Sequence, residues 1–141
     1  MPISVLLVDD EENFVATLAK RLRIRRFEVV TASSGAAALA ALEVRPVDVV
    51  VLDVRMPDLD GIAATKIIKA RHPVTEVILL TGHASLEASM EGLTVGAFDY
   101  LLKPIDIDEL VFKIEDAYRK KELEDQTSGH QNDQHDISGE Q

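Results

Sequence analysis

Four apolar runs in the sequence each end on polar side chains of the kinds that bind metal ions or phosphate. The side chains are those of Asp9, Asp10, Asp53, Thr81 and Lys103. Carboxylates gathered in one pocket would repel each other and raise one another's pKa. A hard divalent cation such as Mg²⁺, which binds oxygen ligands, resolves that conflict. A lysine and a hydroxyl beside the cation suit a phosphoryl group, so the set is typical of a site where a carboxylate carries phosphate.

These residues meet only if the runs before them form one sheet. The clear runs are residues 3–8, 47–52 and 77–80, and two weaker candidates cover 98–102 and 27–31. Runs that are apolar on both faces and rich in β-branched residues are typical of strands buried in a parallel sheet. Ligands of open α/β sheets bind beyond the carboxyl ends of the strands, so we expect the polar residues at one edge.

Segments with helical periodicity lie between the predicted strands. They cover residues 14–22, 36–42, 62–68, 86–95 and 107–118. Ser33 and Ser34 are placed to cap the second segment, and Asp106 with Glu109 resembles a capping box before the last. Five strands alternating with five helices predict an α/β fold with a parallel sheet covered on both faces.

The composition excludes several classes of protein. The chain has 141 residues, which is the length of one domain, and no cysteine, which excludes disulfides and thiol chemistry. No apolar run reaches membrane-span length and no signal peptide is visible, so we expect a cytoplasmic protein without membrane contact. Neither a P-loop nor a GxGxxG motif is present, and nothing indicates nucleic-acid binding by this chain alone.

The net charge of −10 is concentrated near the C-terminus. Residues 122–141 hold six acidic residues and no Lys or Arg, and the helical pattern stops near Glu124. A polar segment of this kind buries too little apolar surface to fold alone. We therefore expect a folded domain over residues 1–121 and a disordered acidic tail or linker over 122–141.

The motifs together resemble the response-regulator receiver domain of two-component signal transduction, over about residues 3–121. The matching motifs are Val8-Asp9-Asp10-Glu11-Glu12, Leu52-Asp53-Val54-Arg55-Met56-Pro57-Asp58, Asp60-Gly61, Thr81-Gly82 and Lys103-Pro104. Tyr100 stands three residues before Lys103, where that family often has an aromatic switch residue. The resemblance implies a flavodoxin-like fold, a five-stranded parallel sheet in the order 2-1-3-4-5.

The resemblance also implies a role for each site residue. Asp53 would accept a phosphoryl group from a sensor histidine kinase or phosphotransfer protein. Thr81 and Lys103 would bind phosphoryl oxygens, and the peptide bond between Lys103 and Pro104 would be cis. The resemblance implies that Mg²⁺ binds to Asp9, Asp10, Asp53 and the backbone carbonyl of Arg55.

By the same resemblance, Thr81 and Tyr100 would rearrange on phosphorylation. The rearrangement would alter the face formed by residues 86–118, where a partner or a second copy of the chain would dock. The chain would act as a phosphoacceptor, not as an enzyme with steady turnover. Its own sequence shows no output domain, so it is either a single-domain regulator or the excised receiver of a transcriptional regulator.

Other interpretations stay open at the level of sequence. A haloacid-dehalogenase-type phosphatase also uses an aspartate nucleophile and Mg²⁺ but needs Asp-x-Asp after its first strand. A flavodoxin-like electron carrier needs a Ser/Thr/Gly-rich loop there, and Asp9 and Asp10 would repel its phosphate. A receiver-like protein that no longer takes phosphate is disfavoured, because the acids, Thr81 and Lys103 are all present.

Two further features carry weaker expectations. The basic residues at 20, 21, 23, 25 and 26 fit a solvated helix end, where cations suit the helix dipole. The resemblance implies kinase docking as the alternative, and nucleic-acid contact is a distant third. His83 and Arg55 each lie two residues after a site residue, at the rim of the expected pocket. The resemblance implies that side chains at these rim positions influence how fast the acyl phosphate hydrolyses, and the bulk and charge of these two predict an altered lifetime.

Overall fold

The computed structural model describes residues 2–82 and 86–140, with residues 127–140 described by their backbone alone. The strands are β1 (Ser4–Val8), β2 (Glu28–Ala32), β3 (Val49–Asp53), β4 (Glu76–Thr81) and β5 (Asp99–Leu102). The helices are α1 (Glu12–Ile24), α2 (Gly35–Val44), α3 (Gly61–Arg71), α4 (Leu86–Thr94) and α5 (Ile107–Glu140). The ten elements predicted from the sequence are all present, in the predicted order.

The strands form one parallel sheet in the order β2-β1-β3-β4-β5, which confirms the expected topology. Val8 at the end of β1 pairs with Leu52, and Thr81 at the end of β4 pairs with Leu102. Because the register is this even, β1, β3, β4 and β5 end at the same edge of the sheet. The polar residues that follow or close these strands are therefore brought together.

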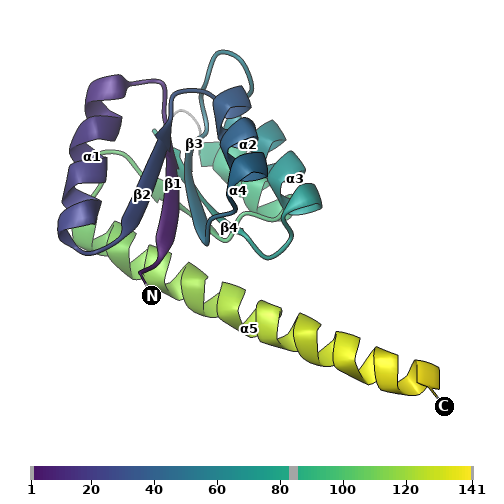
Figure 1. Ribbon diagram of the computed structural model, residues 1–141. Helices are drawn as coiled ribbons and strands as arrows, with labels where there is room; N and C mark the ends of the chain where they lie inside the picture. The colour runs from purple at the N-terminus through teal and green to yellow at the C-terminus, as the bar shows by residue number, and fades with distance from the viewer. Residues whose placement is uncertain (1, 83–85, 141) are drawn as a thin grey trace.

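Helices cover both faces of the sheet, as Figure 1 shows. On one face, α1 and α5 pack against alternate strand residues that include Val5, Val51 and Ile78. On the other face, α2 and α3 bury Leu6, Val50 and their neighbours, with α4 beside α3. β3, β4 and all of β1 except its first residue are buried, which explains why these strands appear in the sequence as nearly continuous apolar runs.

Side-chain caps set the starts of three helices. The Ser34 hydroxyl accepts a hydrogen bond from Ala37 N at 3.0 Å and begins α2, as the sequence predicts. Asp60 accepts from Ala63 N at 2.8 Å and begins α3. Asp106 Oδ1 accepts from the backbone of Asp108 and Glu109 at the start of α5.

The C-terminal segment differs from the sequence expectation. The sequence predicts a tail without regular structure from residue 122, whereas α5 continues as one helix to Glu140 and projects away from the sheet (Figure 1). Over residues 122–125 the helix gains support from the (i, i+4) ion pairs Lys120–Glu124 and Lys121–Asp125. The boundary between domain and tail at residue 121 stays a prediction.

Among the residues described, no helix combines the length and the apolar character that a membrane span requires. α5 is long enough, but its sequence is predominantly polar and charged.

Candidate functional site

Three carboxylates meet at the edge of the sheet where β1 and β3 end. Asp9 and Asp10 follow β1, and Asp53 closes β3. Each offers one carboxylate oxygen, and these oxygens lie within 4.8 Å of one another. Asp9 is fully buried and Asp53 is 7% exposed, while Asp10 is exposed. The predicted cluster is therefore formed, with one side open to solvent.

Asp9 links the cluster to its surroundings. Its Oδ1 accepts a hydrogen bond from Glu11 N at 3.0 Å, and its Oδ2 accepts one from the ammonium of Lys103 at 2.9 Å. These bonds satisfy a carboxylate that has no exposed surface, as a buried charge requires. Asp9 is thus held in place before any ligand binds.

The environment of Asp53 disfavours its charged form. Burial is the largest cause and the charge of Asp9 the next, and together they raise the pKa of Asp53 from 3.8 to about 6. The charge of Lys103 and a hydrogen bond from the Arg55 backbone N–H act in the opposite direction. A positive ion at this carboxylate would relieve the repulsion from Asp9.

Lys103 supplies the positive charge of the site. Its ammonium lies 3.6 Å from Asp53 Oδ1 as well as 2.9 Å from Asp9 Oδ2. Burial works against the charged ammonium, but the hydrogen bond with Asp9 and the charges of Asp53 and Asp9 outweigh it and raise the pKa of Lys103. The peptide bond between Lys103 and Pro104 is cis, as predicted.

Phe14 on α1 is a neighbour of the site that the sequence did not reveal. The Lys103 ammonium lies 4.7 Å from the centre of the Phe14 ring, within the range of a cation–π contact. In the sequence Phe14 belongs to the apolar stripe of α1, so its type and spacing indicate a core residue and nothing more. Phe14 and Lys103 are 89 positions apart in the sequence, so their contact becomes visible only in the folded structure.

Thr81 and Tyr100 lie on neighbouring strands, β4 and β5. Thr81 is buried, and its hydroxyl donates to the Gly82 carbonyl at 3.0 Å. Tyr100 is half-buried and packs against the core on the α3 and α4 side of the sheet. Thr81 closes its strand at the carboxylate edge, while Tyr100 lies within β5, two residues before that strand ends.

The remaining predicted site positions have mixed outcomes. Arg55 follows Asp53 closely and is exposed at the rim, as expected. His83 lies outside the described residues. The basic residues of 20–26 are all exposed at the end of α1, where Arg23 donates to the Val29 carbonyl at 2.8 Å and Arg25 pairs with Asp108 at 3.9 Å. These contacts tie part of the cluster to its own domain.

The loop between β3 and α3 is fixed by two aspartates. Asp60 caps α3, whereas Asp58 accepts hydrogen bonds from Gly35 N at 3.2 Å and Ala36 N at 3.0 Å at the start of α2. These bonds lower the pKa of Asp58. Asp58 therefore connects the loop after Asp53 to the start of a different helix, α2.

Gly61 is placed where a side chain would collide with the site strand. A Cβ there would lie 2.6 Å from the carbonyl oxygen of Asp53 and 2.8 Å from the Cα of Val54. Gly61 N also donates to the Val54 carbonyl at 2.8 Å. The absence of a side chain thus lets α3 begin directly against the end of β3.

The substitution Gly61→Ala is expected to destabilise the domain by about 1–3 kcal/mol, because backbone atoms of β3 must move. It is also expected to slow any chemistry at Asp53 by displacing that residue. Thermal unfolding tests the first effect. Gly82→Ala is the control for stability, since a Cβ there would meet nothing within 4 Å. Equal unfolding temperatures for Gly61→Ala and the unchanged protein would contradict this account of the loop.

The donor set at this edge fits a hard divalent cation. Three carboxylate oxygens within 4.8 Å of one another are the ligands that Mg²⁺ prefers, with water completing its octahedral shell. The open side beside the exposed Asp10 leaves room for those waters and for a phosphoryl oxygen. Among the described residues this is the one group of three such side chains close enough to hold a metal ion.

Comparison with known proteins identifies the class to which this fold and site belong. Residues 5–115 match the family model of the response regulator receiver domain. The regulatory protein AtoC of Escherichia coli (strain K12) is 40% identical over 124 residues, which cover 84% of this chain and 27% of AtoC. The DNA-binding transcriptional regulator NtrC of the same strain is 42% identical over 113 residues, covering 80% of this chain and 24% of NtrC.

A solved structure agrees with these matches. The response regulator receiver domain protein from Clostridium thermocellum superposes with a TM-score of 0.82 at 35% identity, covering 86% of this chain and 98% of that chain. The chain described here belongs to the response regulator receiver domain family of two-component systems. It spans about a quarter of the length of the curated relatives it matches. Membership of this family replaces the phosphatase and electron-carrier interpretations.

Proposed function

We propose that this domain is a phosphoacceptor switch in which Asp53 takes a phosphoryl group from a sensor histidine kinase or a phosphotransfer protein. The observation that carries the proposal is the position of the Asp53 carboxylate. It lies within 3.6 Å of the Lys103 ammonium, in a cluster of three acids whose oxygens lie within 4.8 Å. Receiver domains of two-component systems interact with kinases or phosphotransfer proteins. That a donor of this kind phosphorylates Asp53 here is part of the proposal.

The transfer is a substitution at phosphorus. An oxygen of the Asp53 carboxylate forms a bond to the phosphorus of a phosphohistidine, and the bond from phosphorus to the imidazole nitrogen breaks. The electron pair of that bond goes to the imidazole nitrogen, which then takes a proton. The product is an acyl phosphate on Asp53.

The neighbours of Asp53 stabilise the incoming charge. Lys103 is positioned to pair with one phosphoryl oxygen, and the Thr81 hydroxyl, after leaving the Gly82 carbonyl, can donate to another. Asp9, Asp10, Asp53 and the Arg55 carbonyl would hold Mg²⁺. When bound, this ion would neutralise the charge shared between the carboxylates and the phosphoryl oxygens.

A groove beside the site supports docking of a phosphodonor protein. It has a volume of about 360 Å³ and lies between α1 and the segment after β5, with Phe14, Arg21, Lys103 and Ile105 in its lining. The lining combines apolar side chains with two basic side chains and one acidic side chain, Glu11, and such a mixed groove fits a donor helix that carries a phosphohistidine. The groove opens next to Lys103, so a donor seated there would bring its phosphoryl group to Asp53.

The face made by α4, β5 and α5 supports an output role. Within residues 86–118, the exposed large apolar side chains on these elements are Leu86, Met90, Leu93, Leu102 and Phe112. A surface of this kind marks an interaction site. We propose that movement of Thr81 and Tyr100 changes this face, so that a partner or a second copy of the chain binds there. The domain acts as a phosphoacceptor without steady turnover.

The proposal predicts uptake of one phosphoryl group from a small donor. The protein is incubated with acetyl phosphate and Mg²⁺, and its intact mass is recorded over time. We expect an added mass of one phosphoryl group, and we expect EDTA to prevent it. Absence of uptake from acetyl phosphate, phosphoramidate and a phosphorylated donor protein alike would overturn the proposal.

Mg²⁺ alone is expected to stabilise the domain. Binding to the folded state only, at a concentration about 100 times the Kd, contributes about 2.7 kcal/mol. The thermal midpoint should therefore rise with Mg²⁺ and fall back with EDTA. In Asp10→Asn the rise should be much smaller, because one ligand has lost its charge. The same rise in Asp10→Asn would argue against this set of ligands.

A further inference from the structure

The sheet edge opposite the aspartate cluster carries a second group of charged residues that phosphoryl transfer does not use. Glu76 is the first residue of β4, and its side chain is fully buried. Asp48 directly precedes β3 and is 17% exposed. Both acids are bound by lysines of α5, which lies across this edge (Figure 1).

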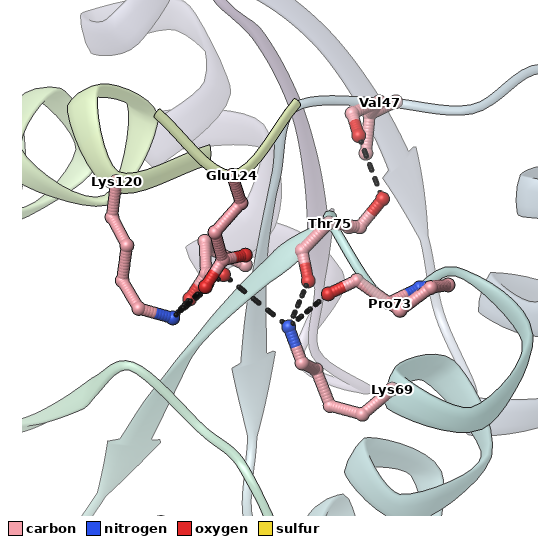
Figure 2. Close-up of polar contacts among 7 residues, drawn as sticks. Val47, Lys69, Pro73, Thr75, Lys120 and Glu124 are labelled. Carbon is pink, nitrogen blue, oxygen red and sulfur yellow. Dashed lines mark hydrogen bonds and ion pairs between the residues drawn. The ribbon is translucent and has the colours of Figure 1, made fainter. Parts of the chain in front are cut away.

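Glu76 is held by two lysines from different helices. Lys120 on α5 donates to its two carboxylate oxygens at 3.1 Å and 3.2 Å. Lys69 on α3 approaches its Oε1 at 3.3 Å and donates to the carbonyls of Pro73 at 2.8 Å and Thr75 at 2.9 Å. Figure 2 shows these bonds, with Lys69 turned toward the α3–β4 turn and Lys120 reaching in from α5. A buried carboxylate on β4 therefore connects two helices.

Asp48 forms a second connection in the same way. Its Oδ2 accepts from the backbone N–H and the hydroxyl of Ser4, at 2.9 Å and 3.0 Å, at the start of β1. Its Oδ1 pairs with Lys121 at 2.9 Å. Lys121 is the residue after Lys120, so two consecutive residues of α5 bind the starts of two adjacent strands.

Each lysine also binds an acid one turn further along α5. Lys120 pairs with Glu124 at 2.9 Å, and Lys121 pairs with Asp125 at 3.1 Å. Consecutive residues of an α-helix point about 100° apart. Because Lys120 and Lys121 bind acids at the starts of two separate strands, they oppose rotation of α5 about its axis. They also oppose tilting of α5 away from the sheet.

We propose that Lys120 and Lys121 form a two-point clamp that fixes the direction in which α5 leaves the domain. Buried ion pairs add little net stability compared with apolar packing, but they accept few geometries. We therefore expect the four acids around these two adjacent lysines to fix the orientation of α5 more than they stabilise the domain. The clamp also sets α5 relative to β3 and β4, the strands that carry Asp53 and Thr81 at their other ends.

Spin labels test the clamp directly. The chain has no cysteine, so Lys66→Cys on α3 and Ser128→Cys on α5 can be labelled specifically. Double electron–electron resonance then gives the distribution of distances between the labels. We expect one narrow distribution in the otherwise unchanged protein. In Lys120→Met with Lys121→Met it should broaden by roughly twofold or more, because beyond the core contacts of Ala117 and Tyr118 the direction of α5 then rests on the helix alone.

Two further variants keep this test decisive. Arg119→Met removes a neighbouring charge that pairs with Asp116 on α5 itself, so the distribution should stay narrow. Lys121→Met alone should give intermediate broadening even if the double variant unfolds, since Asp48 keeps its bonds to Ser4. An unchanged distribution in the folded Lys120 and Lys121 variants would overturn the clamp.

Hydrogen exchange gives an independent readout. Amides of residues 119–126 should exchange roughly tenfold faster in the double variant, while those of residues 110–117 should keep their protection. Equal exchange of 119–126 in the double variant and in the unchanged protein would also count against the clamp. Phosphoryl uptake at Asp53 enters neither readout, so the clamp and the phosphoacceptor role can fail separately.

Discussion

Asp53→Asn is expected to abolish phosphoryl uptake from acetyl phosphate in the presence of Mg²⁺. The amide has no anionic oxygen to attack phosphorus, and its nitrogen is a poor nucleophile. The substitution keeps the size of the side chain, so the burial of the strand end and the contact between Lys103 and Asp9 can persist. Intact mass measured over time reports the loss.

Asp58→Asn is the matched control for this prediction. Asp58 lies in the same loop, but its carboxylate bonds to Gly35 and Ala36 at the start of α2 and not to the cluster. We expect this variant to take up one phosphoryl group like the unchanged protein. Uptake by Asp53→Asn at the normal rate, or loss of uptake in both variants, would show that the acceptor has been assigned wrongly.

Asp53→Asn is also expected to stabilise the metal-free domain above pH 6. The pKa of Asp53 is raised from 3.8 to about 6, so the folded state binds the proton more tightly than the unfolded chain does. Ionisation of Asp53 therefore costs folded-state stability, and the cost grows as the pH rises from about 4 to about 6. Because water still screens the open side, we expect Asp53→Asn to gain about 1–2 kcal/mol at pH 7.

Urea unfolding at several pH values measures this gain. Asp53→Asn and the unchanged protein should be equally stable near pH 3.5 and should diverge until about pH 6. Addition of Mg²⁺ should reduce the difference, since the ion favours the charged carboxylate. A gap that shrinks as the pH rises would contradict the assigned direction of the pKa.

Lys69→Met is expected to cause a large loss of stability far from the site. Lys69 donates to the Pro73 and Thr75 carbonyls and pairs with Glu76, whose side chain has no exposed surface. Methionine fills similar space but donates nothing, so two carbonyls and a buried carboxylate lose a partner. With Lys120 still bound to Glu76, we expect a cost of about 2–4 kcal/mol.

Lys66→Met is the control for Lys69→Met. Lys66 lies one turn earlier on α3 and is exposed, so its replacement should change stability by less than about 0.5 kcal/mol. Urea unfolding of both variants at pH 7 makes the comparison. If the Lys69→Met domain were as stable as the Lys66→Met domain, Lys120 alone would be sufficient to compensate the buried charge of Glu76, which would contradict the prediction.

The sequence predicted the fold and most of the candidate site because both depend on local patterns. Runs buried on both faces, such as residues 47–52, left few arrangements other than a parallel sheet. Asp9, Asp53 and Lys103 could be placed together because parallel strands end at one edge. The cis bond before Pro104 agrees with what the resemblance implied. The hydrogen bond from Lys103 to Asp9 was not among the implied contacts and comes from the structure.

Long-range contacts could not be predicted in this way. Glu76 precedes an apolar run, and no local pattern shows that it is buried or that it pairs with Lys120, 44 residues later. Phe14 looks like ordinary core until Lys103 is placed beside it. The continuation of α5 beyond residue 121 was missed because its polar composition indicates a segment without a core. Lysines bound to Glu76 and Asp48 support the start of that continuation.

The chemical identity of the phosphorylated residue tests the central claim most directly. The protein is charged with acetyl phosphate and Mg²⁺, reduced with borohydride, digested and analysed by mass spectrometry. Borohydride reduces an aspartyl phosphate to homoserine but leaves phosphate esters of serine and threonine unchanged. The account predicts homoserine at position 53 and at no other position. Phosphate retained on a hydroxyl side chain, or homoserine at position 9 or 10, would contradict it.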